Sequence, residues 1–188
     1  MLSGLIIPSE KYSPTLPNSG LYTNLLSLII SQEVAFNKGR LIRRKIYAEC
    51  GIPIDPHKLL KCNLDEFGLT ISRSNLIRTI TKDYIEKDVI DLEEISLMKG
   101  IGPWTIKGTK LLSGLADAYT SLYEDSYIRK RIKEYLGLTI LPTIAQTKKM
   151  FEELGPHQRS VTIFLWRIKP SGIKKLLEVK ELNTIDFV

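Results

Sequence analysis

The sequence has only two cysteines, Cys50 and Cys62, among its 188 residues. Two cysteines cannot form the disulfide framework of a small secreted domain, and they fall short of the thiolates that usually bind an iron–sulfur cluster. A zinc site made of Cys50, His57 and Cys62 would match no common ligand spacing and would lack a fourth ligand. We therefore expect no metal site, no cluster and a reducing, intracellular environment.

Long apolar runs are also missing. No stretch approaches the ~18 apolar residues of a transmembrane helix, and the N-terminal residues lack the basic region and long apolar stretch of a secretion signal. Hydrophobic residues make up 43% of the chain and charged residues 26%, which suits a folded core better than a disordered segment. We expect a soluble protein with no membrane partner, in the cytoplasm or nucleoid, or in the nucleus of a eukaryote.

Positive charge exceeds negative charge by a small margin. The chain has 27 Lys and Arg against 21 Asp and Glu, a net charge of +6, which permits binding to a polyanion but is weak support for it. The charges gather in two clusters, one over 38–45 and one over 129–133. Alone, each cluster is most simply a solvated helix face.

The hydrophobic periodicity is helical almost throughout. An apolar stripe over 21–30 predicts a central, mostly buried helix. Only residues 138–141 suggest a strand, and since Gly137 and Pro142 bracket them we interpret them as a connector. Similar patterns predict further helices over 41–46, 59–67, 72–87, 92–98, 103–115, 126–136, 143–154, 157–167 and 171–188. The predicted fold is all-α.

Prolines and serines mark the expected boundaries. Pro8, Pro14 and Pro17 predict an extended N-terminal arm over 1–20, which leaves 21–188 as one domain. Pro53 and Pro56 are expected to close the second helical unit. Ser72 or Ser74 is expected to cap the helix over 72–87.

The most informative local motif is the Gly-x-Gly turn in Leu97–Thr105, which reads Leu-Met-Lys-Gly-Ile-Gly-Pro-Trp-Thr. Pro103 stands where a first helical residue is expected, so the turn predicts a tight hairpin between two helices. Gly100 and Gly102 let another molecule approach the backbone closely. Unpaired N–H groups at the start of the second helix can bind a phosphate without reading sequence, assisted by Lys99, Lys107 and Lys110. A Gly-x-Gly turn alone, however, is more often an ordinary connection between helices.

An acidic residue, Asp125, follows the hairpin in the segment Tyr-Glu-Asp-Ser-Tyr-Ile-Arg over 123–129. It stands directly before the helix predicted over 126–136. An isolated Asp at that place usually caps its helix, so the pattern gains meaning only together with the hairpin.

Together these segments resemble the helix-hairpin-helix superfamily of DNA glycosylases, in which a Leu-x-x-Gly-Ile/Val-Gly hairpin precedes an essential Asp before a helix. Within it, the chain is most similar to the 3-methyladenine, or alkylbase, branch. Three further segments carry this similarity: Ser31-Gln32, Pro103-Trp104-Thr105, and Arg159-Ser160 leading to Phe164-Leu165-Trp166-Arg167. The resemblance covers about residues 21–169 and implies two helical lobes, folded as a single unit, with a base pocket between them.

The resemblance also implies roles for residues. Asp125 would act at the sugar of a nucleotide rotated out of damaged double-stranded DNA, where it stabilises developing positive charge. A pocket for the base would be lined by Trp104, Tyr127, Trp166 and Gln32. DNA contacts would come from Gly100, Gly102, Thr105, Lys99, Lys107 and Arg129. Such an enzyme works as a monomer without a cofactor, although a monovalent cation at the hairpin is left open.

Two positions affect how far the resemblance extends. Relatives that also cut the strand place a Schiff-base lysine where this chain has Trp104, which predicts a monofunctional hydrolase. The resemblance to the alkylbase branch implies 3-methyladenine and 7-methylguanine as its substrates. Lys107, one turn further on, keeps open a glycosylase/lyase for oxidised bases. Glu33 stands where the family inserts a wedge into the duplex, and a carboxylate there would face phosphate repulsion. A DNA-binding module without catalysis is the third alternative.

Overall fold

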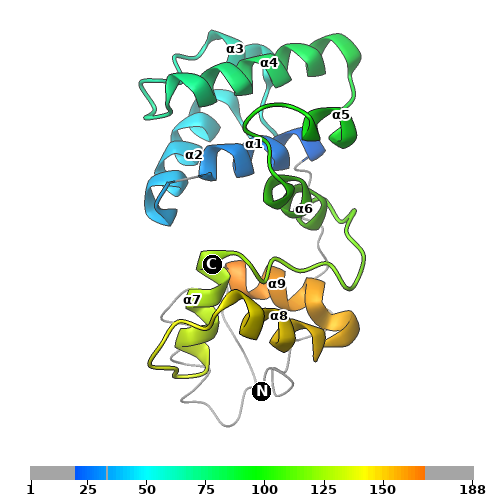
Figure 1. Ribbon diagram of the computed structural model, residues 1–188. Helices are drawn as coiled ribbons and strands as arrows, with labels where there is room; N and C mark the ends of the chain where they lie inside the picture. Colours follow the sequence, from blue (N-terminus) through cyan, green and yellow to red (C-terminus); the bar gives the residue numbers. More distant parts are fainter. Residues whose placement is uncertain (1–19, 33, 168–188) are drawn as a thin grey trace, which may run out of the picture. The chain divides into compact units, whose positions relative to one another are not determined.

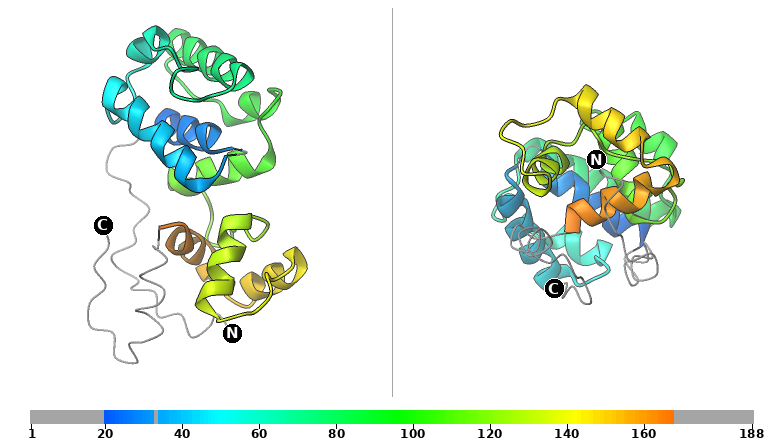
Figure 2. Two further views of the ribbon diagram at one scale, coloured as in Figure 1. Left: turned by 90° about the vertical axis from the view of Figure 1, so that its left-hand side faces the viewer. Right: turned by 90° about the horizontal axis from the view of Figure 1, so that it is seen from below.

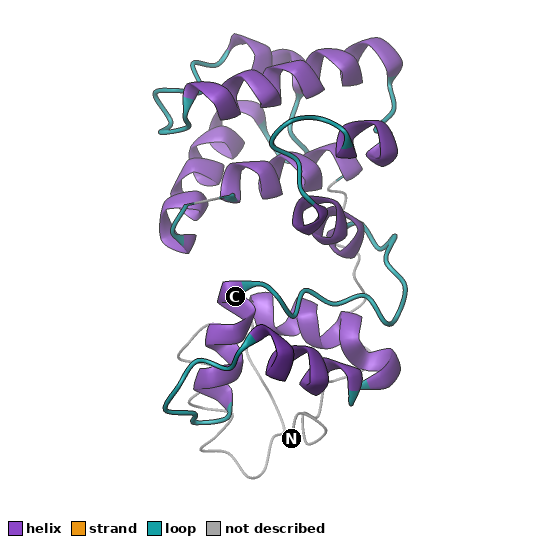
Figure 3. Cartoon of the chain, viewed as in Figure 1, coloured by secondary structure: helices purple, strands orange, loops and turns teal. Residues whose placement is uncertain are grey.

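The computed structural model describes residues 20–32 and 34–167, apart from the side chains of Phe36 and Arg167. The predicted terminal helix over 171–188, the wedge position Glu33 and all of the predicted arm except Gly20 lie outside the described residues. Within the described ranges the regular structure is entirely helical and no strand is present (Figures 1 and 3). The predicted all-α fold is confirmed, and residues 138–141 form a connector.

The chain divides into two compact units, with the boundary between Leu115 and Ala116. The first unit contains α1 (Leu21–Ser31), α2 (Phe36–Cys50), α3 (Pro56–Lys61), α4 (Ile71–Lys87), α5 (Leu92–Ser96) and α6 (Pro103–Leu112). The second contains α7 (Ser126–Tyr135), α8 (Ile144–Glu152), the 3₁₀ turn η2 (Gly155–His157) and α9 (Gln158–Arg167). That the two form a single folding unit stays a prediction.

Helix α1 is the centre of the first unit. It packs against α2, α4 and α6, which lie around it in Figure 1 and in the left-hand view of Figure 2. This confirms the buried helix that the wide apolar stripe predicts. Its buried residues are Tyr22, Thr23, Asn24, Leu25, Leu26, Leu28, Ile29 and Ile30.

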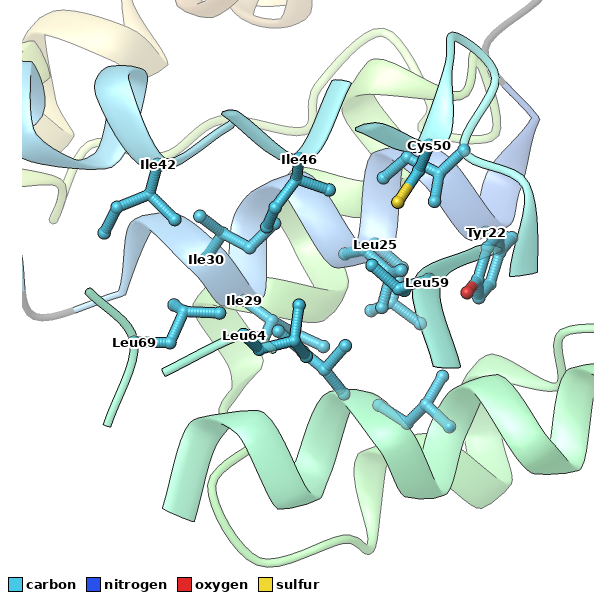
Figure 4. Close-up of a cluster of buried hydrophobic side chains, with 14 of the residues drawn as sticks. Tyr22, Leu25, Ile29, Ile30, Ile42, Ile46, Cys50, Leu59, Leu64 and Leu69 are labelled. Atoms are coloured by element: carbon cyan, nitrogen blue, oxygen red, sulfur yellow. The ribbon is translucent and has the colours of Figure 1, made fainter. Parts of the chain in front are cut away.

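The core of the first unit joins α1 to the helices around it. Figure 4 shows Leu25, Ile29 and Ile30 of α1 among side chains from α2 and from the segment that follows it. Full burial of an aliphatic side chain stabilises a protein by about 1.5–3 kcal/mol, so this cluster is the main source of stability for the unit that carries the hairpin. Its other labelled members are Tyr22, Ile42, Ile46, Cys50, Leu59, Leu64 and Leu69.

Side-chain caps set two helix starts differently from the sequence prediction. Asp55 Oδ1 accepts hydrogen bonds from the backbone N–H groups of His57 and Lys58, and Pro56 is the first residue of α3. The second helical unit closes before Pro53 and Pro56 as predicted, since α2 ends at Cys50. Pro56 also begins the next helix, because proline, which needs no N–H partner, is favoured at a first helical position. The helix predicted over 59–67 accordingly begins earlier, and it ends at Lys61.

The start of α4 also differs. Thr70 caps it, with its hydroxyl accepting from the N–H of Arg73, so the prediction of Ser72 or Ser74 as the cap was wrong. Ser74 is buried inside the helix and donates to Asp65 Oδ1 at 2.5 Å. Its hydroxyl is therefore satisfied by a side chain outside the helix, a partner that sequence spacing does not reveal.

In the second unit α7 packs against α9. The buried side chains Ile128, Ile132, Phe151, Phe164 and Leu165 form its apolar interior. Helix α8 starts with a capping box, in which Thr143 and Gln146 bond to each other's backbone N–H groups. The packing against α9 holds α7, the helix that Asp125 precedes.

We expect the first unit to lose stability in alkali. Burial raises the pKa of Tyr22 above its ordinary 10.0 and raises that of the Cys50 thiol from 9.0 to about 12. A group with a higher pKa in the folded state binds its proton more tightly there, so its contribution is complete below the unfolded pKa and is lost as the pH rises. The loss begins above pH 9.0 for Cys50 and above pH 10.0 for Tyr22.

Urea midpoints measured between about pH 8 and about pH 11 check this expectation. The midpoint should fall with rising pH, and Tyr22→Phe should fall less steeply above pH 10.0 because it lacks the titrating hydroxyl. Equal slopes for the two proteins would contradict the assignment to Tyr22.

Candidate functional site

The hairpin between α5 and α6 is a tight turn that needs glycine. The N–H of Ile101 donates to the carbonyl of Met98 at 3.0 Å, which closes the turn. Gly100 has φ +95°, and a Cβ built there would lie 3.4 Å from Leu76 Cδ2. Any other residue would be strained at this φ, so the backbone at Gly100, which is exposed, is kept bare.

Helix α6 begins at the hairpin without a side-chain cap. Gly102 precedes it and has no side chain, and Pro103 is the first helical residue. The three helices before it, α3, α4 and α5, all start with a side-chain cap. Because no side chain caps this helix start, the positive end of the helix dipole is open to an anion.

Gln32 holds the hairpin against the end of α1. Its Nε2 donates to the carbonyl of Gly100 at 3.2 Å and to Thr105 Oγ1 at 2.5 Å. Thr105 is 1% exposed, so the structure places it beneath the hairpin. The roles predicted for these residues, Gln32 in the base pocket and Thr105 at DNA, stay predictions. The structure shows in addition that the two hydrogen bonds of Gln32 hold the hairpin turn in place.

Gln32→Ala should loosen the hairpin. It leaves Thr105 Oγ1 and the Gly100 carbonyl without the donor that they now share, at an expected cost of about 1–2 kcal/mol in the free energy of unfolding. DNA affinity should fall as well. Urea denaturation and a binding titration check both, with Asn63→Ala as control because the Asn63 amide donates to nearby Glu66 Oε1. Stability equal to that of the control would contradict the bracing role.

Asp125 caps α7. Its own N–H donates to the carbonyl of the buried Leu122 at 2.9 Å, and its Oδ1 accepts from the N–H groups of Tyr127 at 2.7 Å and Ile128 at 3.0 Å. The capping role of an Asp before a helix is therefore present. The same bonds fix the direction of a half-buried carboxylate, at a helix end that favours negative charge. Capping and a fixed catalytic carboxylate are compatible.

Arg159 holds the segment that leads to Asp125, a role that sequence analysis missed. Its Nη1 donates to the carbonyl of Ala116 at 2.7 Å, and its backbone N–H donates to Ala118 at 3.1 Å. Ser121 donates to Gln158 Oε1 at 3.2 Å, beside it. The resemblance includes Arg159-Ser160 but says nothing of these partners. The Ala116 carbonyl that Arg159 binds lies 43 residues earlier in the sequence.

The ring of Tyr127 is covered on one face by Arg131, which the sequence analysis placed only in the basic cluster over 129–133. The guanidinium lies 4.5 Å from the ring centroid, Nη2 donates to the Tyr127 hydroxyl at 2.8 Å, and Nη1 bonds to Glu134. Arg131 is only 7% exposed. A ring face that already holds one cation is poorly suited to a second, so a methylated purine would have to meet the other face or the edge. Spacing of i, i+4 on α7 was the available signal.

The two basic clusters differ in the structure. In the cluster over 129–133, Arg129 Nε donates to the carbonyl of Pro142 at 2.8 Å and Arg131 lies against Tyr127. In the cluster over 38–45, Arg43 is half-buried and bonds to Ser31 Oγ, and burial lowers its pKa. The remaining cations of that cluster, Lys38, Arg40, Arg44 and Lys45, are exposed on α2. Helix α2 is therefore the more open cationic surface.

The other predicted site residues fall in both units. Trp104 and Lys107 are half-buried on α6, and Lys99 is exposed beside the hairpin. Trp166 is half-buried on α9. Their roles stay predictions, as does the juxtaposition of Asp125 with the hairpin.

Two further findings concern metal binding and membrane-spanning helices. Among residues 20–32 and 34–167 there is no group of three or more His, Cys, Asp and Glu side chains that could hold a metal ion. In the same part of the chain, no helix has both the length and the apolar character needed to cross a membrane.

Comparisons with known proteins confirm the resemblance. No protein-family model matches the chain. In sequence, it is 20% identical over 171 residues to the alkylbase DNA glycosidase-like protein mag2 of Schizosaccharomyces pombe, covering 81% of this chain and 79% of that protein.

Three solved structures share its fold. The first is the 3-methyladenine DNA glycosylase Mag1 of Schizosaccharomyces pombe in complex with abasic DNA, with TM-score 0.65, 18% identity and coverage of 82% of this chain and 83% of that one. The second is the 3-methyladenine DNA glycosylase from Archaeoglobus fulgidus, with TM-score 0.63, 18% identity and coverage of 78% and 57%. The third, the DNA-3-methyladenine glycosidase from Bacillus halodurans, has TM-score 0.52, 17% identity and coverage of 85% and 78%. The chain has the fold of these enzymes.

Proposed function

We propose, on the premise of this shared fold, that the chain is a DNA glycosylase that hydrolyses the N-glycosidic bond of alkylated purines. The observation that carries the proposal is the fold that the chain shares, over most of its length, with the 3-methyladenine DNA glycosylases. The hairpin and Asp125 add chemical support: one offers a backbone site for phosphate, and the other offers an oriented carboxylate.

In this proposal the hairpin binds the damaged strand. The positive, uncapped start of α6 attracts a phosphate, and the bare Gly100 backbone allows the strand to come close. Lys99 and the exposed cations of α2 add attraction that does not depend on sequence. Affinity should therefore fall steeply as salt is raised.

Catalysis begins once the damaged nucleotide has rotated out of the duplex, which costs least where damage has weakened the base pair. As the glycosidic bond breaks, positive charge develops on the sugar. The carboxylate of Asp125 stabilises that charge and can orient the attacking water. Because its capping bonds already hold it in one direction, little reorganisation is needed during the reaction. Trp104 offers an aromatic ring for a cationic methylated purine.

The bond is proposed to break by hydrolysis without a covalent intermediate. A strand-cutting relative would carry its Schiff-base lysine at the position of Trp104, and an indole cannot form that adduct. Borohydride reduction in the presence of damaged DNA checks this step. No enzyme–DNA adduct is expected, and an adduct that disappears in Lys107→Ala would instead support the lyase for oxidised bases.

A second candidate function, DNA binding without turnover, is favoured by one observation: Asp125 already has a complete structural role as the cap of α7. The test that separates the two is a panel of duplexes, each with one alkylated or one oxidised base, with free bases identified by chromatography. The proposal predicts release of 3-methyladenine and 7-methylguanine. Binding to every duplex with release from none would select the binding module.

A further inference from the structure

The two cysteines of the chain are in contact. Cys50 is the last residue of α2, Cys62 directly follows α3, and these two helices pack against each other. Their sulfur atoms lie 3.5 Å apart, and both are free thiols. They are 12 residues apart in sequence, so the fold, not adjacency, brings them together.

The environments of the two thiols are unequal. Cys50 is 1% exposed and belongs to the hydrophobic core (Figure 4). Cys62 is partly exposed, and its Sγ donates to the carbonyl of Lys58 at 3.3 Å. Burial, reinforced by the neighbouring Cys62, raises the pKa of the Cys50 thiol to about 12. A water-borne oxidant therefore meets Cys62 first, while Cys50 stays protonated behind it.

We propose that Cys50 and Cys62 form a reversible intramolecular disulfide when the protein meets a peroxide. The thiolate of Cys62 attacks one peroxide oxygen and breaks the O–O bond, which gives a sulfenic acid and hydroxide. Cys50 then attacks that sulfur, its proton leaves with the sulfenic hydroxyl as water, and the S–S bond forms. The two sulfurs together lose two electrons, which the peroxide takes up.

The bridge would join the C-terminal ends of α2 and α3, next to the hydrophobic core that surrounds α1. A cross-link between these positions restricts the unfolded chain more than the folded one. Because the sulfurs are already in contact, only a local movement is required to reach bonding distance. We expect the oxidised protein to melt roughly 5 °C higher than the reduced protein.

The test uses the full chain treated with hydrogen peroxide at several protein concentrations, blocked with iodoacetamide and analysed by peptide mass spectrometry. The expected result is one peptide pair joined through Cys50 and Cys62, formed at a rate independent of protein concentration and reversed by dithiothreitol. A disulfide between two copies, or two thiols that both remain open to alkylation while methionine oxidises, would overturn the proposal. A Tm that falls on oxidation would also overturn it.

Two variants keep the test decisive. Cys62→Ser changes a partly exposed position and should fold normally, and peroxide should then leave Cys50 as a thiol. Cys50→Ala removes the second sulfur, so Cys62 should stop at the sulfenic acid, which dimedone traps. Wild-type protein should give little trapped sulfenic acid, because Cys50 consumes it. Equal trapping in the wild type and in Cys50→Ala would contradict the paired reaction even if the variant is less stable.

Discussion

Asp125→Asn is expected to slow base release roughly 100- to 1,000-fold while DNA binding changes little. The substitution removes the negative charge that the proposal places beside the sugar. It keeps an oxygen that can accept the capping bonds from Tyr127 and Ile128, and Asn is as good a helix cap as Asp. The loss should therefore appear in the single-turnover rate of excision and not in the free energy of unfolding.

Asp55 provides a matched control for this variant. Its Oδ1 accepts from two backbone N–H groups at 2.8 and 3.1 Å, in the same capping arrangement as Asp125. Asp55→Asn should leave excision unchanged. A parallel Asp125→Ala variant should lose excision and also about 1 kcal/mol of stability, since alanine cannot cap. If Asp125→Asn excises at the wild-type rate, Asp125 is a structural cap only.

Gly100→Ala is expected to lower DNA affinity at least tenfold, which corresponds to about 1.4 kcal/mol. Alanine at φ +95° is strained, and its Cβ would lie 3.4 Å from Leu76 Cδ2, so the turn that the proposal places against a phosphate would have to shift. The strain alone should destabilise the fold by about 1–2 kcal/mol. A binding titration with a duplex that contains an abasic-site analogue measures the first effect, and urea denaturation measures the second.

Gly68→Ala separates the two effects. Gly68 is exposed in the same unit and has the same φ of +95°, with its nearest atom, Ile42 Cδ1, 4.0 Å from a built Cβ. It should show a similar loss of stability and normal DNA affinity. If the two variants lose affinity equally, the hairpin has no special part in binding.

The sequence predicted the helices well where burial alone decides them. The wide apolar stripe of α1 marks a helix enclosed on several sides, and the structure has it between α2, α4 and α6. The hairpin could also be predicted from the sequence, since a proline after a Gly-x-Gly turn permits few conformations. The start of α3 was missed, although Asp55 before Pro56 is itself a start signal: a capping side chain followed by proline at the first helical position.

What sequence reasoning could not supply were contacts between distant residues. Gln32 meets the hairpin 68 and 73 residues further along the chain, and Cys50 touches Cys62 only because α2 and α3 pack together. Such partners depend on tertiary packing, which no local periodicity encodes. Arg131 differs, because its i, i+4 spacing from Tyr127 was visible; its burial was not.

The most direct test of the central claim is a single-turnover reaction of excess protein with end-labelled duplex that carries 3-methyladenine. The account predicts free 3-methyladenine in step with the appearance of abasic sites, in a strand that stays intact until alkali cleaves it. The account would be contradicted if the protein, in excess, bound the duplex but left its methylated base in place even after a long incubation.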